Sequence, residues 1–259
     1  GAYLLLILLF IKKPNDATYV NFLFGFTALT VYLVFWIIIY KKEKIKWVWV
    51  SIHNIKKRFI ENFQFFISSI AGHVSIHGGL IILASFVNNT ILGEFALAQK
   101  IALLMRMVPV FFTQAILQNA TVLFKKDKIE FNSYVNRIFI TGLSITLGMG
   151  LMVFLLSKWI IFLLAGSFVI YSETILKILA FIPFLSMLNF NNMIKILVDE
   201  KKYLLTRATW ITAIVMLILA TIGSYYYGGY GLSIALVLTE IVSFIVYSSL
   251  LTKNKYERA

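Results

Sequence analysis

Long apolar stretches alternate with short polar ones along most of this 259-residue chain. A helix needs about 20 mostly apolar residues to cross the hydrocarbon core of a bilayer. The stretches that are long enough are residues 17–40, 62–86, 94–123, 134–157, 172–197, 203–226 and 229–252. Strands of a membrane barrel would be about 10 residues long with strict alternation, which these continuous stretches lack. The pattern predicts an all-α, polytopic membrane protein with about seven full transmembrane helices.

One further apolar stretch, Gly1–Ile11, is too short to cross the membrane. It is not preceded by the basic region of a signal peptide and is not followed by a small-residue cleavage site. We interpret it as the end of a truncated transmembrane helix. The sequence is then expected to be the C-terminal part of a longer protein.

The polar segments between the apolar stretches have the composition of helical-hairpin turns, as in Lys12–Asp16 and Gly228–Gly231. The longest one, residues 41–61, is different, because apolar residues recur in it at helical spacing. These residues are Ile45, Val48, Trp49, Ile52, Ile55 and Phe59. Most of its basic residues lie off that stripe, which predicts a basic amphipathic helix in the membrane interface. The alternative is a solvated connector.

The composition supports the membrane class. Hydrophobic residues make up 60% of the chain and charged residues 14%, against roughly 25% charged residues in soluble domains. The mean hydropathy is +0.88. Such a chain could not cover itself with a polar surface, which excludes soluble and disordered proteins. The absence of cysteine excludes disulfides and thiolate–metal chemistry.

The net charge of +13 would suggest nucleic acid as a partner of a soluble chain, but here the charges lie on alternate loops. Sixteen lysines and arginines lie in residues 41–61, 124–133, 198–207 and the tail from Lys253. Only three lie in residues 12–16, 87–93, 157–171 and 226–230. Because cytoplasmic loops carry the excess of positive charge, we expect the first set and the C-terminus to be cytoplasmic.

A charge deep in the membrane is costly and usually faces a bundle interior or an aqueous cavity. Arg106 is 12 residues into its predicted span, close to the middle of the membrane. Gln99, Arg106 and Thr113 share one helix face, and Gln114 lies close to it. This stripe either lines a translocation cavity in which Arg106 meets an anion, or holds Arg106 against a buried carboxylate that only stabilises the bundle.

Further polar residues inside the predicted spans also leave alternatives. Glu240 is either the structural partner of an intramembrane cation or a site for a proton or a cation, and Lys100 is either cavity lining or an interfacial anchor. Asn189 and Asn192 belong to a stripe that either lines a cavity or makes hydrogen bonds between helices. His73 and His77, one turn apart, either line a polar cavity or pack with hydrogen bonds.

No sequence motif for bond chemistry is present. The chain has no Walker-type loop, no HExxH and no GxSxG motif, so we expect no enzyme and no cofactor. The histidine pair has no local third ligand, so we expect no metal site. The aromatic residues, 16% of the chain, fit membrane-interface belts better than stacking on nucleic acid.

Two segments resemble Wzx-type polysaccharide repeat-unit flippases, which belong to the MOP exporter superfamily together with MATE drug exporters. Leu92–Ile101 resembles the family segment G-x-[YF]-x-x-A-x-[KR]-I, with matches at Gly93, Phe95, Ala98, Lys100 and Ile101. Glu94 departs from it, because the family often has an aromatic or apolar residue there. Residues 166–179 resemble, with looser spacing, the family's entry to its tenth helix.

The resemblance implies a MATE-like fold of twelve helices in two lobes. Residues 1–40 would hold the last two helices of the N-terminal lobe, 41–61 the inter-lobe linker, 62–252 the C-terminal six-helix lobe, and 253–259 a cytoplasmic tail. It also implies a bacterial inner-membrane protein that flips an undecaprenyl-pyrophosphate-linked oligosaccharide through a cationic cavity by alternating access. H⁺ or Na⁺ would be the coupling ion, and other polysaccharide assembly proteins would be partners.

The function classes that compete with this one differ in the residues they need. The cationic cavity would be lined by Arg106, Lys100, Gln99, Gln114 and the Asn189/Asn192 stripe. A MATE-like exporter of organic cations favours acidic residues deep in the helices, where only Glu240 qualifies. A membrane glycan polymerase usually needs a large charged outer loop, and the outer loops here are short.

Overall fold

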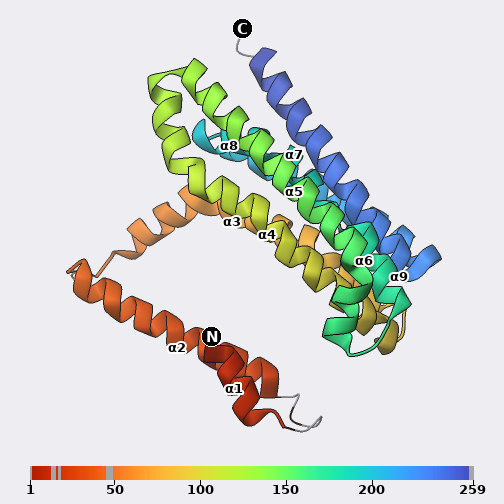
Figure 1. The fold of residues 1–259 in the computed structure, drawn as a ribbon. Coiled ribbons are helices and arrows are strands. Elements are labelled where there is room, and N and C mark those ends of the chain that lie inside the picture. The colour runs from red at the N-terminus through yellow and green to blue at the C-terminus, as the bar shows by residue number, and fades with distance from the viewer. Residues whose placement is uncertain (1, 13–15, 17–18, 45–48, 257–259) are drawn as a thin grey trace. The chain divides into compact units, whose positions relative to one another are not determined.

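The computed structural model describes residues 2–12, 16, 19–44 and 49–256, and every regular element among them is a helix. The chain divides into two compact units, Gly1–Arg58 and Phe59–Ala259. In the described part of the chain, six helical segments are long and apolar enough to cross a membrane. The all-α, polytopic membrane class expected from the sequence is confirmed. Figure 1 shows the elements in chain order.

The first unit contains α1 (Ala2–Phe10) and α2 (Tyr19–Lys42). With nine residues α1 is too short to cross a membrane, whereas α2 corresponds to the predicted span 17–40. The rings of Tyr3 and Phe24 meet edge to face with their centroids 5.4 Å apart, so α1 packs against α2.

Two expectations from the sequence fall partly outside the described residues. In the turn Lys12–Asp16, the backbone N–H of Lys12 donates to the Asp16 carboxylate over 3.1 Å, while residues 13–15 are not described. In the basic segment 41–61, Ile45 and Val48 of the apolar stripe likewise lie outside the described residues. From Ile52 onward this segment is helical and continues without a break into the predicted span 62–86, as α3 (Ile52–Ala84). Its location in the membrane interface stays a prediction.

Two 38-residue helices follow, α4 (Asn89–Lys126) and α5 (Lys128–Ala165). A polar side chain caps the start of each helix, and a glycine ends the second one. The side chain of Asn88 accepts from the Ile91 N–H at the start of α4. Asp127 likewise accepts from the first N–H groups of α5, and both are preferred N-cap residues. Gly166 ends α5 with a φ of 70°, a left-handed conformation that glycine adopts without steric cost.

The predicted single span 172–197 is divided into three short helices, α6 (Ile170–Leu179), α7 (Ile182–Leu188) and α8 (Phe190–Val198). Pro183 lies in the first turn of α7, where a proline is tolerated because its missing N–H would have no partner within the helix. In the most apolar 18-residue stretch of this segment, half of the residues are buried. In the other candidate membrane spans, the buried share of the corresponding stretch is at most 33%. It is therefore the central segment of the second unit, and its breaks lie inside the bundle.

The last helix, α9 (Lys202–Tyr256), has 55 residues and one non-helical residue, Gly228, with φ 56° and ψ −135°. The chain reverses there, because Leu204 and Ala208 share a buried cluster with Tyr247, 43 residues beyond Leu204. The two arms of α9 therefore correspond to the predicted spans 203–226 and 229–252. The turn is tighter than the predicted Gly228–Gly231, because helical geometry resumes directly after Gly228.

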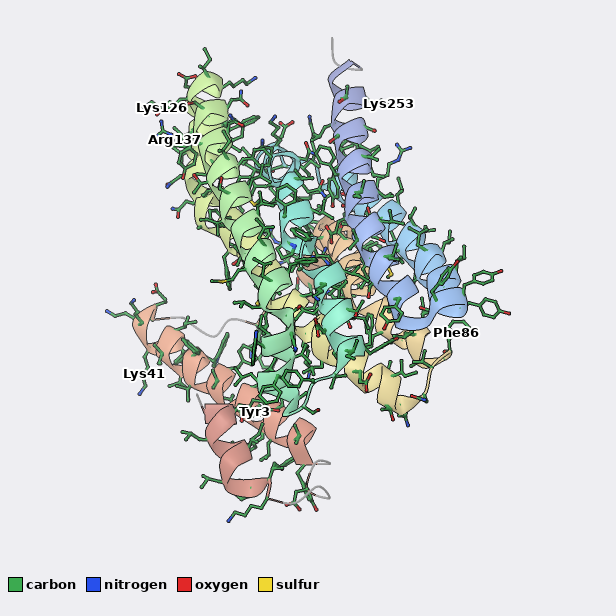
Figure 2. The ribbon with its side chains drawn as sticks, turned by 45° about the vertical axis from the view of Figure 1, so that its right-hand side comes forward. Tyr3, Lys41, Phe86, Lys126, Arg137 and Lys253 are labelled. Atoms are coloured by element: carbon green, nitrogen blue, oxygen red, sulfur yellow. The ribbon has the colours of Figure 1, made fainter. Side chains whose placement is uncertain are left out.

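The loops of the second unit lie at opposite ends according to their charge. In Figure 2, Lys126 and Lys253 lie at one end of this unit and Phe86 lies at the other. Lys126 ends α4 and Lys253 lies near the end of α9, whereas Phe86 follows α3. The alternation of basic and neutral loops along the sequence thus corresponds to two ends of one helix bundle. Below, the end that carries Lys126 and Lys253 is called the basic end.

Candidate functional site

An ion pair inside the second unit joins α4 to α9. The Nη2 atom of Arg106 lies 2.6 Å from the Oε1 atom of Glu240. The hydroxyl of Ser186, on α7, donates to the other oxygen of the same carboxylate over 2.8 Å. The Glu240 side chain is 7% exposed and the Arg106 side chain 27%. Both oxygens of a nearly buried carboxylate are therefore engaged, while the arginine side chain stays partly exposed.

The position of Arg106 follows from the geometry of α4. Arg106 is the 18th of 38 residues, close to the middle of the helix. Three residues later the buried Pro109 lacks the N–H that would bond to the Met105 carbonyl. A proline at this place favours a bend in α4 beside the arginine. The charge is thus held at mid-depth of a helix, one turn before a proline.

Two adjoining cavities meet at the ion pair. The larger has a volume of about 230 Å³ and is bounded by α3, α4, α7, α8 and both arms of α9. The smaller, of about 40 Å³, lies on the side of Gln99. Arg106 and Glu240 line both cavities, and so do Ser75 and Thr212. The two spaces therefore form one polar region around the charges.

Some polar atoms of this region have no partner. The amide nitrogen of Asn189 donates to the Ser243 hydroxyl over 3.1 Å, but its buried Oδ1 atom accepts no hydrogen bond from the part of the chain that the structure describes. The hydroxyl of Thr212 is also buried without a partner among the described residues. Because buried polar atoms are nearly always hydrogen-bonded, these two oxygens are suited to water or to a polar ligand. Together with Arg106 the region can bind an anionic group that also carries hydroxyls.

The residues singled out in the sequence separate into two groups. Arg106, Gln99, Asn189 and Glu240 line the cavities around the ion pair. The predicted common face of Gln99, Arg106 and Thr113 is present, and the Gln99 amide donates to the Ile76 carbonyl over 3.4 Å. The other group lies elsewhere: Lys100, Gln114, His73 and His77 are exposed on this unit, and Asn192 lines a separate cavity at the basic end. Substrate contact by any of these residues stays a prediction.

Asn189 and Asn192 both donate to serine hydroxyls on the second arm of α9, so their stripe makes hydrogen bonds between helices. Asn189 donates to Ser243 over 3.1 Å and Asn192 donates to Ser248 over 2.9 Å. The two residues nevertheless line different cavities, because Asn189 lies between α7 and α8 beside the ion pair and Asn192 lies farther along, in α8. Sequence spacing alone could not reveal this division.

The two histidines lie one turn apart on α3, as expected. Their ring centroids are 6.3 Å apart, and Nδ1 of His73 is 2.9 Å from the Ser69 carbonyl oxygen. Within the described residues no group of three or more histidine, cysteine, aspartate or glutamate side chains could hold a metal ion. The pair therefore offers hydrogen bonds, and its function stays open between a polar wall and packing.

Residues 2–117 match the family model described as "Polysaccharide biosynthesis protein". A search of curated proteins and a search of solved structures each found no match. The matched segment begins in the first unit and ends inside α4, so it includes Gln99 and Arg106. Asn189 and Glu240 lie beyond it. Of the two residues of the ion pair, Arg106 therefore lies inside the matched segment and Glu240 lies outside it.

Near the opposite end of the bundle, residues of the segment Leu92–Ile101 act in packing. Phe95 and Ala98 are fully buried in the largest apolar cluster. The Ser172 hydroxyl donates to the Glu94 carbonyl over 2.8 Å and joins α6 to α4. The Gly229 N–H donates to the Tyr171 hydroxyl over 3.0 Å and joins the turn of α9 to α6. These packing and hydrogen-bond contacts give this segment a structural role that does not require a substrate.

Proposed function

We propose that this protein is a transporter that flips undecaprenyl-pyrophosphate-linked oligosaccharide repeat units from the cytoplasmic to the outer leaflet of a bacterial plasma membrane. It would act by alternating access in the assembly of surface polysaccharide, with H⁺ or Na⁺ as the coupling ion. The observation that carries the proposal is Arg106, a partly exposed cation at mid-depth of a membrane helix, beside a cavity with unpartnered polar oxygens. The match of residues 2–117 to a polysaccharide biosynthesis family supports the substrate class.

The chemistry of the substrate fits this site. A pyrophosphate and its sugars cannot cross hydrocarbon unaided, so they need a polar cavity with positive charge and hydrogen-bond groups. A guanidinium has five N–H donors, and the Glu240 carboxylate is bonded to only one edge of that of Arg106. The remaining donors are available for a phosphate oxygen. The Asn189 and Thr212 oxygens would accept from sugar hydroxyls.

The competing transport function needs the opposite charge. A MATE-like exporter of organic cations would use Glu240 as its acidic site. Here both oxygens of that carboxylate are bonded, one to Arg106 and one to Ser186. The pair is neutral as a whole and offers no excess negative charge to a cationic drug, whereas the guanidinium has further N–H donors for an anion, which favours the flippase.

The proposed arrangement in the membrane follows from the charged loops. The basic end, with Lys126 and Lys253, would face the cytoplasm, as would the C-terminus. Residues 62–252 would be the C-terminal lobe, 1–40 the end of the N-terminal lobe, 41–61 the linker and 253–259 the tail. In this orientation the cavity at Arg106 lies between both leaflets, where a flipped headgroup must pass.

The experiment is a deletion of the gene in its host, followed by measurement of surface polysaccharide and of lipid-linked repeat units in each leaflet. Loss of polysaccharide with repeat units retained on the cytoplasmic leaflet is the expected result. Intact polysaccharide with new sensitivity to cationic drugs would contradict the proposal in favour of an exporter. Single repeat units accumulating on the outer leaflet would contradict it in favour of a polymerase.

A further inference from the structure

A separate cavity of about 380 Å³ lies at the basic end of the second unit. Its walls come from the end of α4, the start of α5, α8 with the turn that follows it, and the last turns of α9. It shares no lining residue with the cavities around Arg106. Its volume falls in the range of roughly 300–1,000 Å³ that is usual for small-molecule sites. The cavity is therefore large enough for a ligand of its own.

The charge of this cavity is positive and only partly compensated. Three lysines line it, Lys128, Lys195 and Lys201, together with one carboxylate, Asp199. The Lys201 ammonium lies 2.6 Å from the Asp199 carboxylate. Lys128 and Lys195 take part in no ion pair within the described part of the chain. Two positive charges without an ion-pair partner among the described residues thus line one cavity, and a bound anion would compensate them.

The other walls of the cavity combine polar and apolar groups. The Asn192 amide donates to the Ser248 hydroxyl over 2.9 Å and joins α8 to α9. The rings of Phe124 and Phe131 meet edge to face at 5.1 Å, and the Lys128 ammonium lies 6.0 Å from the Phe124 ring centroid. Ammonium groups beside an aromatic wall suit a molecule with an anionic head and an apolar tail.

We propose that this cavity binds the phosphate-bearing headgroup of a membrane lipid, with Lys128 and Lys195 in contact with the phosphate. Basic cavities between the ends of membrane helices are suited to anionic headgroups, because each nearby lysine adds attraction at the membrane surface. The aromatic wall would contact the first part of the lipid tail. A phospholipid and a polyprenyl pyrophosphate share this chemistry. The proposal concerns this cavity alone and holds whether or not the protein is a flippase.

The test measures lipid retention by native mass spectrometry of the purified full chain in a neutral detergent. The anionic probes are dioleoylphosphatidic acid and geranylgeranyl pyrophosphate, and dioleoylphosphatidylcholine is the probe without net charge. At least one anionic probe is expected to bind more tightly than dioleoylphosphatidylcholine, by roughly tenfold or more. The tighter of the two anionic probes identifies the source of the headgroup. Equal retention of all three probes would overturn the proposal.

Two double variants that lose the same charge distinguish binding in this cavity from general electrostatic attraction of anionic lipids to the basic end. Lys128→Gln with Lys195→Gln is expected to weaken binding of the anionic probe by about tenfold. The matched control is Lys125→Gln with Lys126→Gln, at the end of α4 but outside the cavity, and it is expected to stay within about twofold of the unchanged protein. Equal weakening in both would overturn the proposal. If the first double variant does not fold, Lys195→Gln alone is compared with Lys125→Gln alone.

Inorganic pyrophosphate distinguishes a lipid site from a site for a soluble ion. We expect it to displace the anionic probe only at a large excess, because it has no tail to contact Phe124 and Phe131. Displacement at equal concentration would overturn the lipid assignment. Because none of these measurements involves transport, their failure is distinct from a failure of the proposed flippase function.

Discussion

Arg106 and Glu240 form an ion pair of 2.6 Å that joins α4 to the second arm of α9. Ser186 holds the second carboxylate oxygen, so three helices meet at one buried charge. An isolated buried carboxylate is strongly unfavourable, and the arginine compensates it. The same arginine has further donors, which would bind the phosphate of the proposed substrate. The structural role of Arg106 and its proposed binding role can therefore be separated by substituting Glu240 together with Arg106.

Stability measures the structural role. Arg106→Ala is expected to lower the free energy of unfolding by about 2–3 kcal/mol, below the roughly 3–5 kcal/mol of fully buried pairs because Arg106 is 27% exposed. Arg106→Ala with Glu240→Gln should regain most of this loss, because the neutral amide still accepts from Ser186. Thermal unfolding in detergent checks both variants. An equal loss in the single and the double variant would contradict the ion pair as the cause.

Transport measures the binding role. The double variant Arg106→Ala with Glu240→Gln is produced in a strain that lacks the original gene. We expect this strain to make no surface polysaccharide, although the variant reaches normal levels in the membrane. Arg106→Lys is also expected to be defective, because lysine keeps the charge but lacks the planar fork that binds phosphate. Normal polysaccharide in the double variant would mean that Arg106 serves only to hold the bundle.

The sequence predicts most of the fold because membrane helices depend on local composition. The length and apolarity of residues 94–123 and 134–157 were enough to predict α4 and α5, and a single glycine at 228 separates the last two spans. The division of residues 172–197 into three helices was not predicted. Its breaks at Ala180–Phe181 and Asn189 lie inside the bundle, where neighbouring helices rather than local preference determine the backbone.

The site was predictable only in part, for a related reason. The depth of Arg106 and Glu240 in their spans indicated that each needs a compensating group. Whether Arg106 and Glu240 meet depends on how α4 and α9 pack against each other. The spacing of residues along a single helix carries no information about that packing. Thr212 and Ser243 were missed, because a hydroxyl in a membrane helix usually bonds to its own backbone and gives no signal in the sequence. Only the structure reveals that the Thr212 hydroxyl is unpartnered.

The hairpin of α9 depends on two glycines that face each other, Gly223 and Gly231. A Cβ atom on Gly231 would overlap the backbone of Gly223, so Gly231→Ala is expected to lower the free energy of unfolding by about 1–3 kcal/mol. Gly148→Ala is the control, because a Cβ there meets nothing within 4 Å. Alanine should leave that helix unchanged or slightly more stable. Equal thermal unfolding temperatures of the two variants would contradict the close contact.

Because the Thr212 hydroxyl has no hydrogen-bond partner among the described residues, we expect its removal to lower transport without lowering stability. Thr212→Val keeps the shape and removes a buried oxygen without a hydrogen bond, so stability should stay the same or rise. Transport should fall by roughly fivefold or more if that oxygen binds a substrate hydroxyl, since such a bond contributes about 1 kcal/mol. Surface polysaccharide and thermal unfolding are the two measurements.

Thr146→Val is the matched control for this variant. Thr146 is fully buried on α5, does not line the cavities at Arg106, and its hydroxyl donates to the Gly142 carbonyl over 2.7 Å. Its removal should cost about 0.5–1.5 kcal/mol of stability and leave transport unchanged. If Thr212→Val instead lost stability and kept full transport, the cavity at Thr212 would not be a substrate site.

The orientation of the bundle can be tested directly, because the chain contains no cysteine and a single one can be introduced as a label. Ser85→Cys lies between α3 and α4, and Lys126→Cys ends α4 at the basic end. If the basic end is cytoplasmic, a membrane-impermeant maleimide should label Ser85→Cys in intact cells and Lys126→Cys only after permeabilisation. The reverse pattern would mean that the basic end faces outward. In that case the lipid site proposed at Lys128 and Lys195 would face the outer leaflet, and the direction of flipping inferred from the loops would be wrong.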